Sequence, residues 1–112
     1  MGKFISTIPF DEIARFCRRW KIKELAIFGS ALREDFTSES DVDFLATFEP
    51  DAEWSLLDHL KMQQELQEIV GRSVDLVSRR ALEHSANWLL RREIMRTAQV
   101  ILSKPEEPRA SG

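Results

Sequence analysis

The chain has 112 residues and is poor in several residue types: it contains no tyrosine, one cysteine, two histidines, four glycines and four prolines. The single cysteine, Cys17, excludes a disulfide within the chain, and because it lies at helical spacing among apolar residues we expect it to pack in the core. His59 and His84 have no second histidine at the spacing of metal ligands. We therefore expect each histidine to be a packing or surface residue and not a metal ligand or a catalytic base.

The sequence also lacks long apolar runs and an excess of basic residues. No run approaches the length of a membrane span, and residues 1–7 contain neither the apolar core nor the cleavage site of a secretory signal. Acidic residues outnumber basic ones by 19 to 16, and the net charge of −3 disfavours a protein that wraps nucleic acid. These features predict a cytoplasmic protein with no membrane contact and no direct nucleic-acid partner.

What remains is the composition of an ordinary soluble globular protein, with 43% hydrophobic and 31% charged residues. The length suits one compact domain. We assign this domain to residues 1–103 and interpret residues 104–112, which contain two prolines and two glutamates, as a flexible C-terminal tail. A second domain that would present a substrate is not expected within this length.

Apolar periodicity predicts helices that alternate with short strands. The expected helices span residues 9–20, 31–36, 55–70 and 87–98, and the expected strands span residues 24–28, 41–48, 74–78 and 100–102. This order predicts an α/β or α+β fold. In that fold, a small mixed sheet of three or four strands is flanked by helices, and one face of the sheet is covered.

The two later helices carry apolar stripes that we assign mostly to the core. In the helix at residues 55–70, the expected core stripe consists of Leu56, Leu60, Met62, Leu66, Ile69 and Val70. In the helix at residues 87–98, the expected core residues are Leu89, Leu90 and Ile94. Trp88, at the start of this last helix, is the best candidate for a partner surface.

Two aspartates stand at the head of the strand predicted for residues 41–48. Asp41 and Asp43 are two residues apart, so their side chains project to the same side with Cα atoms roughly 6.5 to 7 Å apart. Like charges at this spacing repel unless a cation lies between them, and the spacing suits two Mg²⁺ ions about 3.5 to 4 Å apart. Asp75 is the other aspartate in an apolar strand. It completes the site if its strand pairs beside the first, and otherwise it is a strand-edge acid that faces solvent.

A turn suited to phosphate precedes the acids. Gly29 and Ser30 close one strand and open the short predicted helix, where backbone N–H groups, a serine hydroxyl and a helix N-terminus together suit an anion. Arg33, one turn into that helix, either adds a charged fork for a terminal phosphate or pairs with Glu34 or Asp35. A phosphate-binding turn followed by paired acids is what a nucleoside triphosphate and its Mg²⁺ require.

The order Gly29-Ser30, ten residues, then Asp41-Val42-Asp43 resembles the signature of the polymerase beta-like nucleotidyltransferase superfamily, in particular its minimal members. The resemblance extends from residue 9 to about residue 100. It implies the nucleotidyltransferase fold, with the triphosphate bound by Gly29 and Ser30 and two Mg²⁺ ions held by Asp41 and Asp43. It also implies that Asp75 binds one metal ion and helps to activate the attacking hydroxyl.

Minimal nucleotidyltransferases of this kind are similar to the antitoxin halves of HEPN/MNT toxin–antitoxin pairs. The resemblance implies ATP as the substrate, a HEPN-domain ribonuclease toxin as the partner, and transfer of AMP to a tyrosine of that toxin. Because this chain has no tyrosine, we expect the acceptor on the partner. Two alternatives remain. A non-catalytic antitoxin would neutralise its partner by complex formation alone, and an antibiotic-modifying enzyme would need a further substrate domain.

Overall fold

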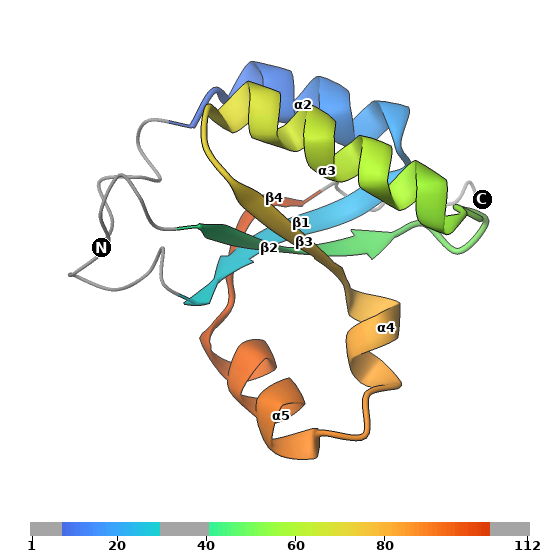
Figure 1. Ribbon diagram of the computed structural model, residues 1–112, viewed down its shortest axis with the longest axis vertical. Helices are drawn as coiled ribbons and strands as arrows, with labels where there is room; N and C mark the ends of the chain where they lie inside the picture. The colour runs from blue at the N-terminus through green and yellow to red at the C-terminus, as the bar shows by residue number, and fades with distance from the viewer. Residues whose placement is uncertain (1–7, 30–40, 104–112) are drawn as a thin grey trace, which may run out of the picture.

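The computed structural model describes residues 8–29 and 41–103. Its elements follow one another along the chain (Figure 1) as α2 (Phe10–Arg19), β1 (Ile22–Phe28), β2 (Val42–Phe48), α3 (Leu56–Val70), β3 (Val74–Ser78), α4 (Arg79–Glu83), α5 (Trp88–Thr97) and β4 (Gln99–Ser103). The helix predicted for residues 31–36, together with Ser30 and Arg33, lies outside the described residues, as does the predicted tail at residues 104–112.

The four strands form one mixed sheet in the order β3-β2-β1-β4. β1 is antiparallel to both β2 and β4, whereas β2 and β3 are parallel. A parallel pair needs a crossover connection, which is why the 15-residue helix α3 separates two strands that lie side by side. The predicted mixed sheet flanked by helices is confirmed, and β4 is the edge strand expected near residue 100.

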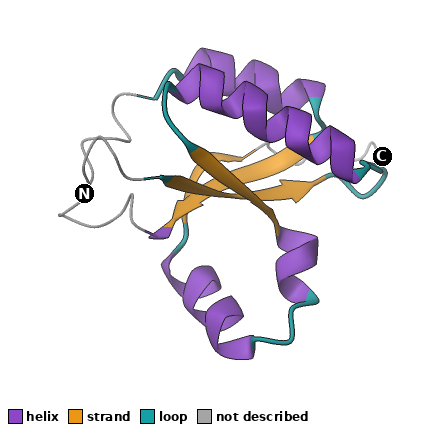
Figure 2. Ribbon diagram, viewed as in Figure 1, coloured by secondary structure: helices purple, strands orange, loops and turns teal. Residues whose placement is uncertain are grey.

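Helices lie on both faces of the sheet: α2 and α3 cover one face, and α4 and α5 lie on the other (Figure 2). The larger core lies under α2 and α3 and includes Phe44 and Leu66. A smaller core on the opposite face consists of Ala26, Leu45, Leu82 and Ile94. The expectation that only one face is covered is wrong, because successive strand residues point to opposite faces and Leu45 is buried just as Phe44 is.

Well-defined caps bound α3. The Ser55 hydroxyl accepts a hydrogen bond from the Asp58 N–H at 3.1 Å, and the Asp58 carboxylate accepts one from the Ser55 N–H at 3.0 Å, which forms a capping box. Gly71 ends the helix in the left-handed conformation, with φ at +81°. This reversal turns the chain back into β3, the strand that carries Asp75.

The expected core stripe of α3 is correct only in its second half. Met62 and Leu66 are fully buried, but Leu56 and Leu60 are 77% and 52% exposed. Successive residues of an α-helix are separated by about 100° of rotation, so Leu60 faces away from Met62. The first half of α3 therefore presents leucines to solvent.

The larger core contains one cysteine and is contacted by two tryptophans. Cys17 is buried in the larger core, as expected. Trp20 and Trp54 pack against the same core as an edge-to-face pair, with ring centroids 5.2 Å apart.

Across residues 8–29 and 41–103, no helix combines the length and the apolar character needed to cross a bilayer.

Candidate functional site

The acids gather at the end of the sheet where β2 and β3 begin. Asp41 directly precedes β2, and Asp43 is the second residue of that strand. In the parallel register of the two strands, Asp43 lies opposite Asp75. The expected pairing of the two strands is thus confirmed, and it brings carboxylates from separate parts of the sequence together.

Strand alternation determines the face from which these acids project. Val42 and Phe44, on either side of Asp43, belong to the larger core under α2 and α3. Asp43 therefore points to the opposite face, and its partner Asp75 points the same way because paired residues of adjacent strands share a face. That face is the one occupied by α4 and α5. Adjacent strands lie about 4.8 Å apart, so both carboxylates can reach one ligand.

Gly29 lies directly against the Asp43 carboxylate of β2. Phe28, the last residue of β1, is in register with Asp43, and Gly29 follows it with φ at +78°. A Cβ atom placed on Gly29 would collide with Oδ2 of Asp43. The missing side chain allows the backbone at the end of β1 to approach the Asp43 carboxylate closely, and it allows a left-handed turn that other residues rarely adopt.

Asp43 is the acid whose ionisation is disfavoured by its surroundings. Partial burial is the main cause, followed by the negative charges of Asp75 and Asp41, and together they raise the pKa of the Asp43 carboxyl above its ordinary value of 3.8. Asp41 and Asp75 are exposed. A cation bound among the three would reverse both causes, because it would supply a partner for the buried charge and offset the repulsion.

The donor atoms fit a hard divalent cation. All three side chains offer carboxylate oxygens, the ligands that Mg²⁺ prefers. Among the described residues, no three or more His, Cys, Asp or Glu side chains are arranged so that they could hold a metal ion by themselves. Mg²⁺ is commonly held by one or two carboxylates together with water and substrate phosphates, so the paired carboxylates of Asp43 and Asp75 meet its requirements without a closed set of protein ligands.

Sequence reasoning missed a cationic residue at this end of the sheet, Arg72. The Val42 N–H donates to the carbonyl of Ser73 at 3.0 Å, which places Arg72 beside the start of both parallel strands. Its guanidinium Nε is buried. Its position between the helix-ending Gly71 and the strand of Asp75 is the signal that could have identified it. The other predicted contributors, Ser30 and Arg33, lie outside the described residues.

A groove of about 440 Å³ opens at the far end of β2, lined in part by Thr47, His59, Arg79 and His84. Thr47 is four residues beyond Asp43, which corresponds to roughly 13 Å along a strand. The groove is therefore separate from the acids. Because the candidate site rests on the carboxylates and the glycine turn, we place the chemistry at the acids and not in this groove.

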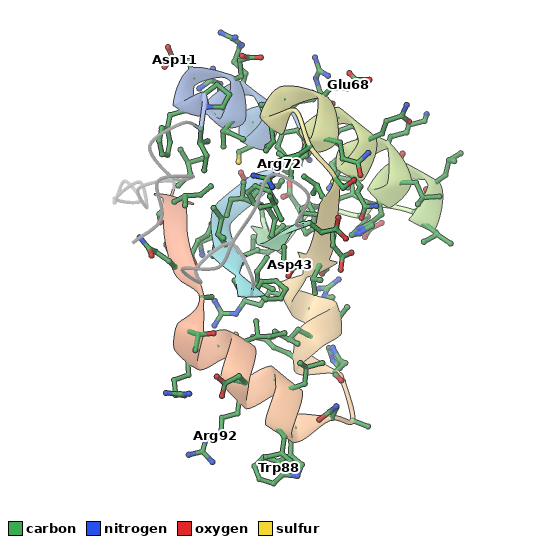
Figure 3. All side chains as sticks on the ribbon, turned by 60° about the vertical axis from the view of Figure 1, so that its left-hand side comes forward. Asp11, Asp43, Glu68, Arg72, Trp88 and Arg92 are labelled. Atoms are coloured by element: carbon green, nitrogen blue, oxygen red, sulfur yellow. The ribbon has the colours of Figure 1, made fainter. Side chains whose placement is uncertain are left out.

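The prediction that Leu89 and Leu90 of α5 lie in the core is wrong. Ile94 is buried as predicted, but Leu89 and Leu90 are 61% and 49% exposed and do not belong to the core of this chain. Trp88 is 55% exposed, and Figure 3 shows it projecting from the end of α5 away from Asp43. Only one side of this ten-residue helix can face the sheet, so the remaining apolar residues form an open patch.

Comparison with known proteins places the chain in a family. Residues 11–101 match the family described as nucleotidyltransferase domain. Protein adenylyltransferase MntA of Thermococcus cleftensis is 32% identical over 77 residues, which cover 69% of this chain and 76% of that protein. Across the matched curated relatives, the aligned part spans between 65% and 81% of their length.

Solved structures share the fold. One described as a minimal nucleotidyltransferase superposes with a TM-score of 0.64 at 30% identity, covering 88% of this chain and 94% of that one. A complex of tri-AMPylated HEPN toxin with MNT antitoxin from Shewanella oneidensis contains a chain with a TM-score of 0.58 at 20% identity, covering 84% and 69%. Together with the acids beside the glycine turn, these matches show that the chain belongs to the nucleotidyltransferase domain family.

Proposed function

We propose that this protein is a Mg²⁺-dependent adenylyltransferase. In this proposal it transfers AMP from ATP to a tyrosine hydroxyl of a partner HEPN-domain ribonuclease toxin and thereby acts as its antitoxin. The observation that carries the proposal is the register of Asp43 with Asp75 beside the close approach of Gly29. That arrangement combines carboxylates for divalent cations with a turn that can bind phosphates.

Each residue has a specific role in the proposed reaction. Asp41, Asp43 and Asp75 would hold two Mg²⁺ ions, which supply positive charge to the triphosphate and to the departing pyrophosphate. The backbone at Gly29 and Ser30 would bind the triphosphate, and the Asp75 carboxylate would accept the proton that the acceptor hydroxyl loses. The acceptor oxygen forms a bond to the α-phosphorus while the bond from that phosphorus to pyrophosphate breaks.

Two of the matched proteins support AMP as the transferred group and a HEPN protein as the acceptor. The Thermococcus cleftensis relative is named a protein adenylyltransferase, and the Shewanella oneidensis complex contains a tri-AMPylated HEPN toxin. This chain has no tyrosine, so a modified tyrosine would have to belong to another molecule. The proposal therefore assigns the acceptor to the partner.

The open patch on α5 supports a protein partner. Trp88, Leu89 and Leu90 are exposed on the helix that lies on the same face of the sheet as the carboxylates. Exposed apolar side chains gathered on one helix are typical of a protein–protein contact. A partner bound there would lie on the same side of the sheet as the Asp43 and Asp75 carboxylates.

The test is transfer of label from α-labelled ATP, in the presence of Mg²⁺, to the purified product of the neighbouring gene. Asp43→Asn removes one carboxylate charge with little change in volume and should abolish transfer. Asp51→Asn is the matched control, because Asp51 is an exposed acid that pairs with Lys21 at 3.3 Å on the surface. Its transfer should equal that of the wild type.

The result also separates catalysis from binding alone. Mass added to a partner tyrosine by the wild type and the Asp51 variant, and absent with the Asp43 variant, is the expected outcome. A stable complex that silences the partner with no added mass would instead make the chain a binding antitoxin. Transfer by the Asp43 variant at the wild-type level would overturn the assignment of catalysis to these acids.

A further inference from the structure

Three polar side chains of α3 bind the outer edge of β3. The side-chain oxygen of Gln67 accepts from the Val74 N–H at 3.1 Å, and that of Gln63 accepts from the Leu76 N–H at 3.1 Å. The carbonyl of Leu76 lies 2.7 Å from Nε2 of His59. A carbonyl can only accept, so His59 donates through Nε2.

The spacing of these residues follows from the geometry of the two elements. His59, Gln63 and Gln67 are four residues apart in turn, so they lie along one face of the helix, with a rise of about 6 Å per step. The N–H groups of Val74 and Leu76 are two residues apart on the strand, or about 6.6 Å. The side chains of α3 can therefore pair with β3 much as a fifth strand would.

These bonds lie on the side of β3 that faces away from β2. The Val42 N–H donates to the Ser73 carbonyl at 3.0 Å. The odd-numbered residues at the start of β3 therefore point their backbone N–H and C=O groups toward β2. Val74 and Leu76 point their N–H and C=O groups away from β2, because these groups alternate in direction along a strand. β3 is at the end of the sheet order, and without α3 its outward groups would be an open edge.

Asp75 lies between the two bonded positions. The N–H of the residue before it is held by Gln67 and the N–H of the residue after it by Gln63. Asp75 itself is exposed, whereas Val74 and Leu76 on either side of it are buried in the larger core. At this point β3 is held by its pairing with β2 on one side and by the two glutamines on the other, and the position of the Asp75 carboxylate relative to Asp43 depends on both.

We propose that Gln63 and Gln67 are positioning residues: they clamp β3 on both sides of Asp75 and thereby set this carboxylate at the distance from Asp43 that a shared Mg²⁺ needs. The inference rests on the proposed function, because it assigns the clamp a role in the same site. Outer partners that orient ligating side chains typically change metal affinity by about 10- to 100-fold when they are removed.

The experiment compares Gln63→Met and Gln67→Met with Gln64→Met. Methionine keeps the length of the side chain but removes the accepting oxygen, and Gln64 is an exposed residue on the same helix that serves as the matched control. Gln63→Glu keeps an accepting oxygen and tests rescue. Two quantities are measured: exchange protection of the Val74 and Leu76 amides without nucleotide, and the Mg²⁺ dissociation constant by calorimetry with AMP-PNP present.

The clamp predicts that each methionine variant loses protection at its own amide and binds Mg²⁺ about 10-fold more weakly. Gln63→Glu should restore both properties, and the control should match the wild type. Unchanged protection, or lost protection with wild-type Mg²⁺ affinity, would overturn the clamp while leaving the proposed function intact. A wild type that binds no Mg²⁺ with AMP-PNP would overturn the proposed function and the clamp with it.

Discussion

Asp43 and Asp75 lie directly opposite each other on adjacent parallel strands, although 31 residues separate them in the sequence. Both project to the face of the sheet on which α4 and α5 lie, and Gly29 approaches Asp43 from β1 on its other side. The central position of Asp43 explains why its ionisation is opposed by burial and by two neighbouring charges.

Asp43→Asn should stabilise the metal-free protein at neutral pH. The folded state raises the pKa of Asp43 above its ordinary value of 3.8, so ionisation of this group destabilises the fold. The destabilisation is absent below 3.8, where the carboxyl is protonated in both states, and grows as the pH rises through the folded pKa. Thermal unfolding in EDTA should show a higher melting temperature for the variant at pH 7 and convergence of the two proteins at acid pH.

Added Mg²⁺ should reverse this order. If Asp43 is a Mg²⁺ ligand as proposed, the wild type gains stability from the bound cation, whereas the variant lacks that ligand. Equal melting temperatures of the two proteins in EDTA at pH 7 would contradict the electrostatic account of Asp43.

Gly29→Ala should damage both the fold and the site. Alanine at φ +78° is strained by about 1 to 2 kcal/mol, and its Cβ would displace the Asp43 carboxylate. Gly71→Ala provides the comparison, because Gly71 has φ +81° but no heavy atom within 4 Å of the added Cβ. Urea unfolding should show a loss of stability in both variants. Calorimetry should show weaker Mg²⁺ binding only in the Gly29 variant. Equal Mg²⁺ binding by both would argue against the close approach of Gly29 to the site.

Trp88→Ser should weaken the partner complex without affecting ATP binding. Trp88 is 55% exposed on α5, and a tryptophan at the centre of a protein interface commonly contributes about 2 kcal/mol or more, equivalent to roughly a 30-fold loss of affinity. Leu56→Ser, on the exposed half of α3, tests the other apolar surface. Affinities for the purified partner can be compared by calorimetry. If only the Leu56 variant loses affinity, the partner binds α3 instead.

Leu82→Ala should destabilise the protein by about 2 to 3 kcal/mol, at the lower end of the range for buried leucines because the smaller core is thin. Leu82 is 5% exposed and packs with Leu45 and Ile94 beneath the sheet. Denaturant unfolding measures the change, and Leu89→Ala, at a 61% exposed position on α5, should cause little loss. Similar values for the two variants would mean that the second face contributes no core.

Local patterns in the sequence were sufficient to predict the strands that carry the acids. The alternation of Val42 and Phe44 with Asp43 predicted a strand with its acid on the opposite face, and β2 has that arrangement. Local patterns failed for α4, because a helix of five residues has no apolar period long enough to detect. They also failed for Leu89 and Leu90, since an apolar stripe looks the same whether it faces the core or a partner.

The sequence by itself determined the spacing of the candidate site residues Gly29, Asp41 and Asp43, because that spacing is local and follows from the geometry of a turn and a strand. Only the tertiary structure decided that Asp75 lies opposite Asp43 and that glutamines of α3 bind the strand beside it. Those relationships depend on the register of a parallel pair and on the packing of a helix along its edge. Both are set by contacts between residues far apart in the chain, which no local pattern contains.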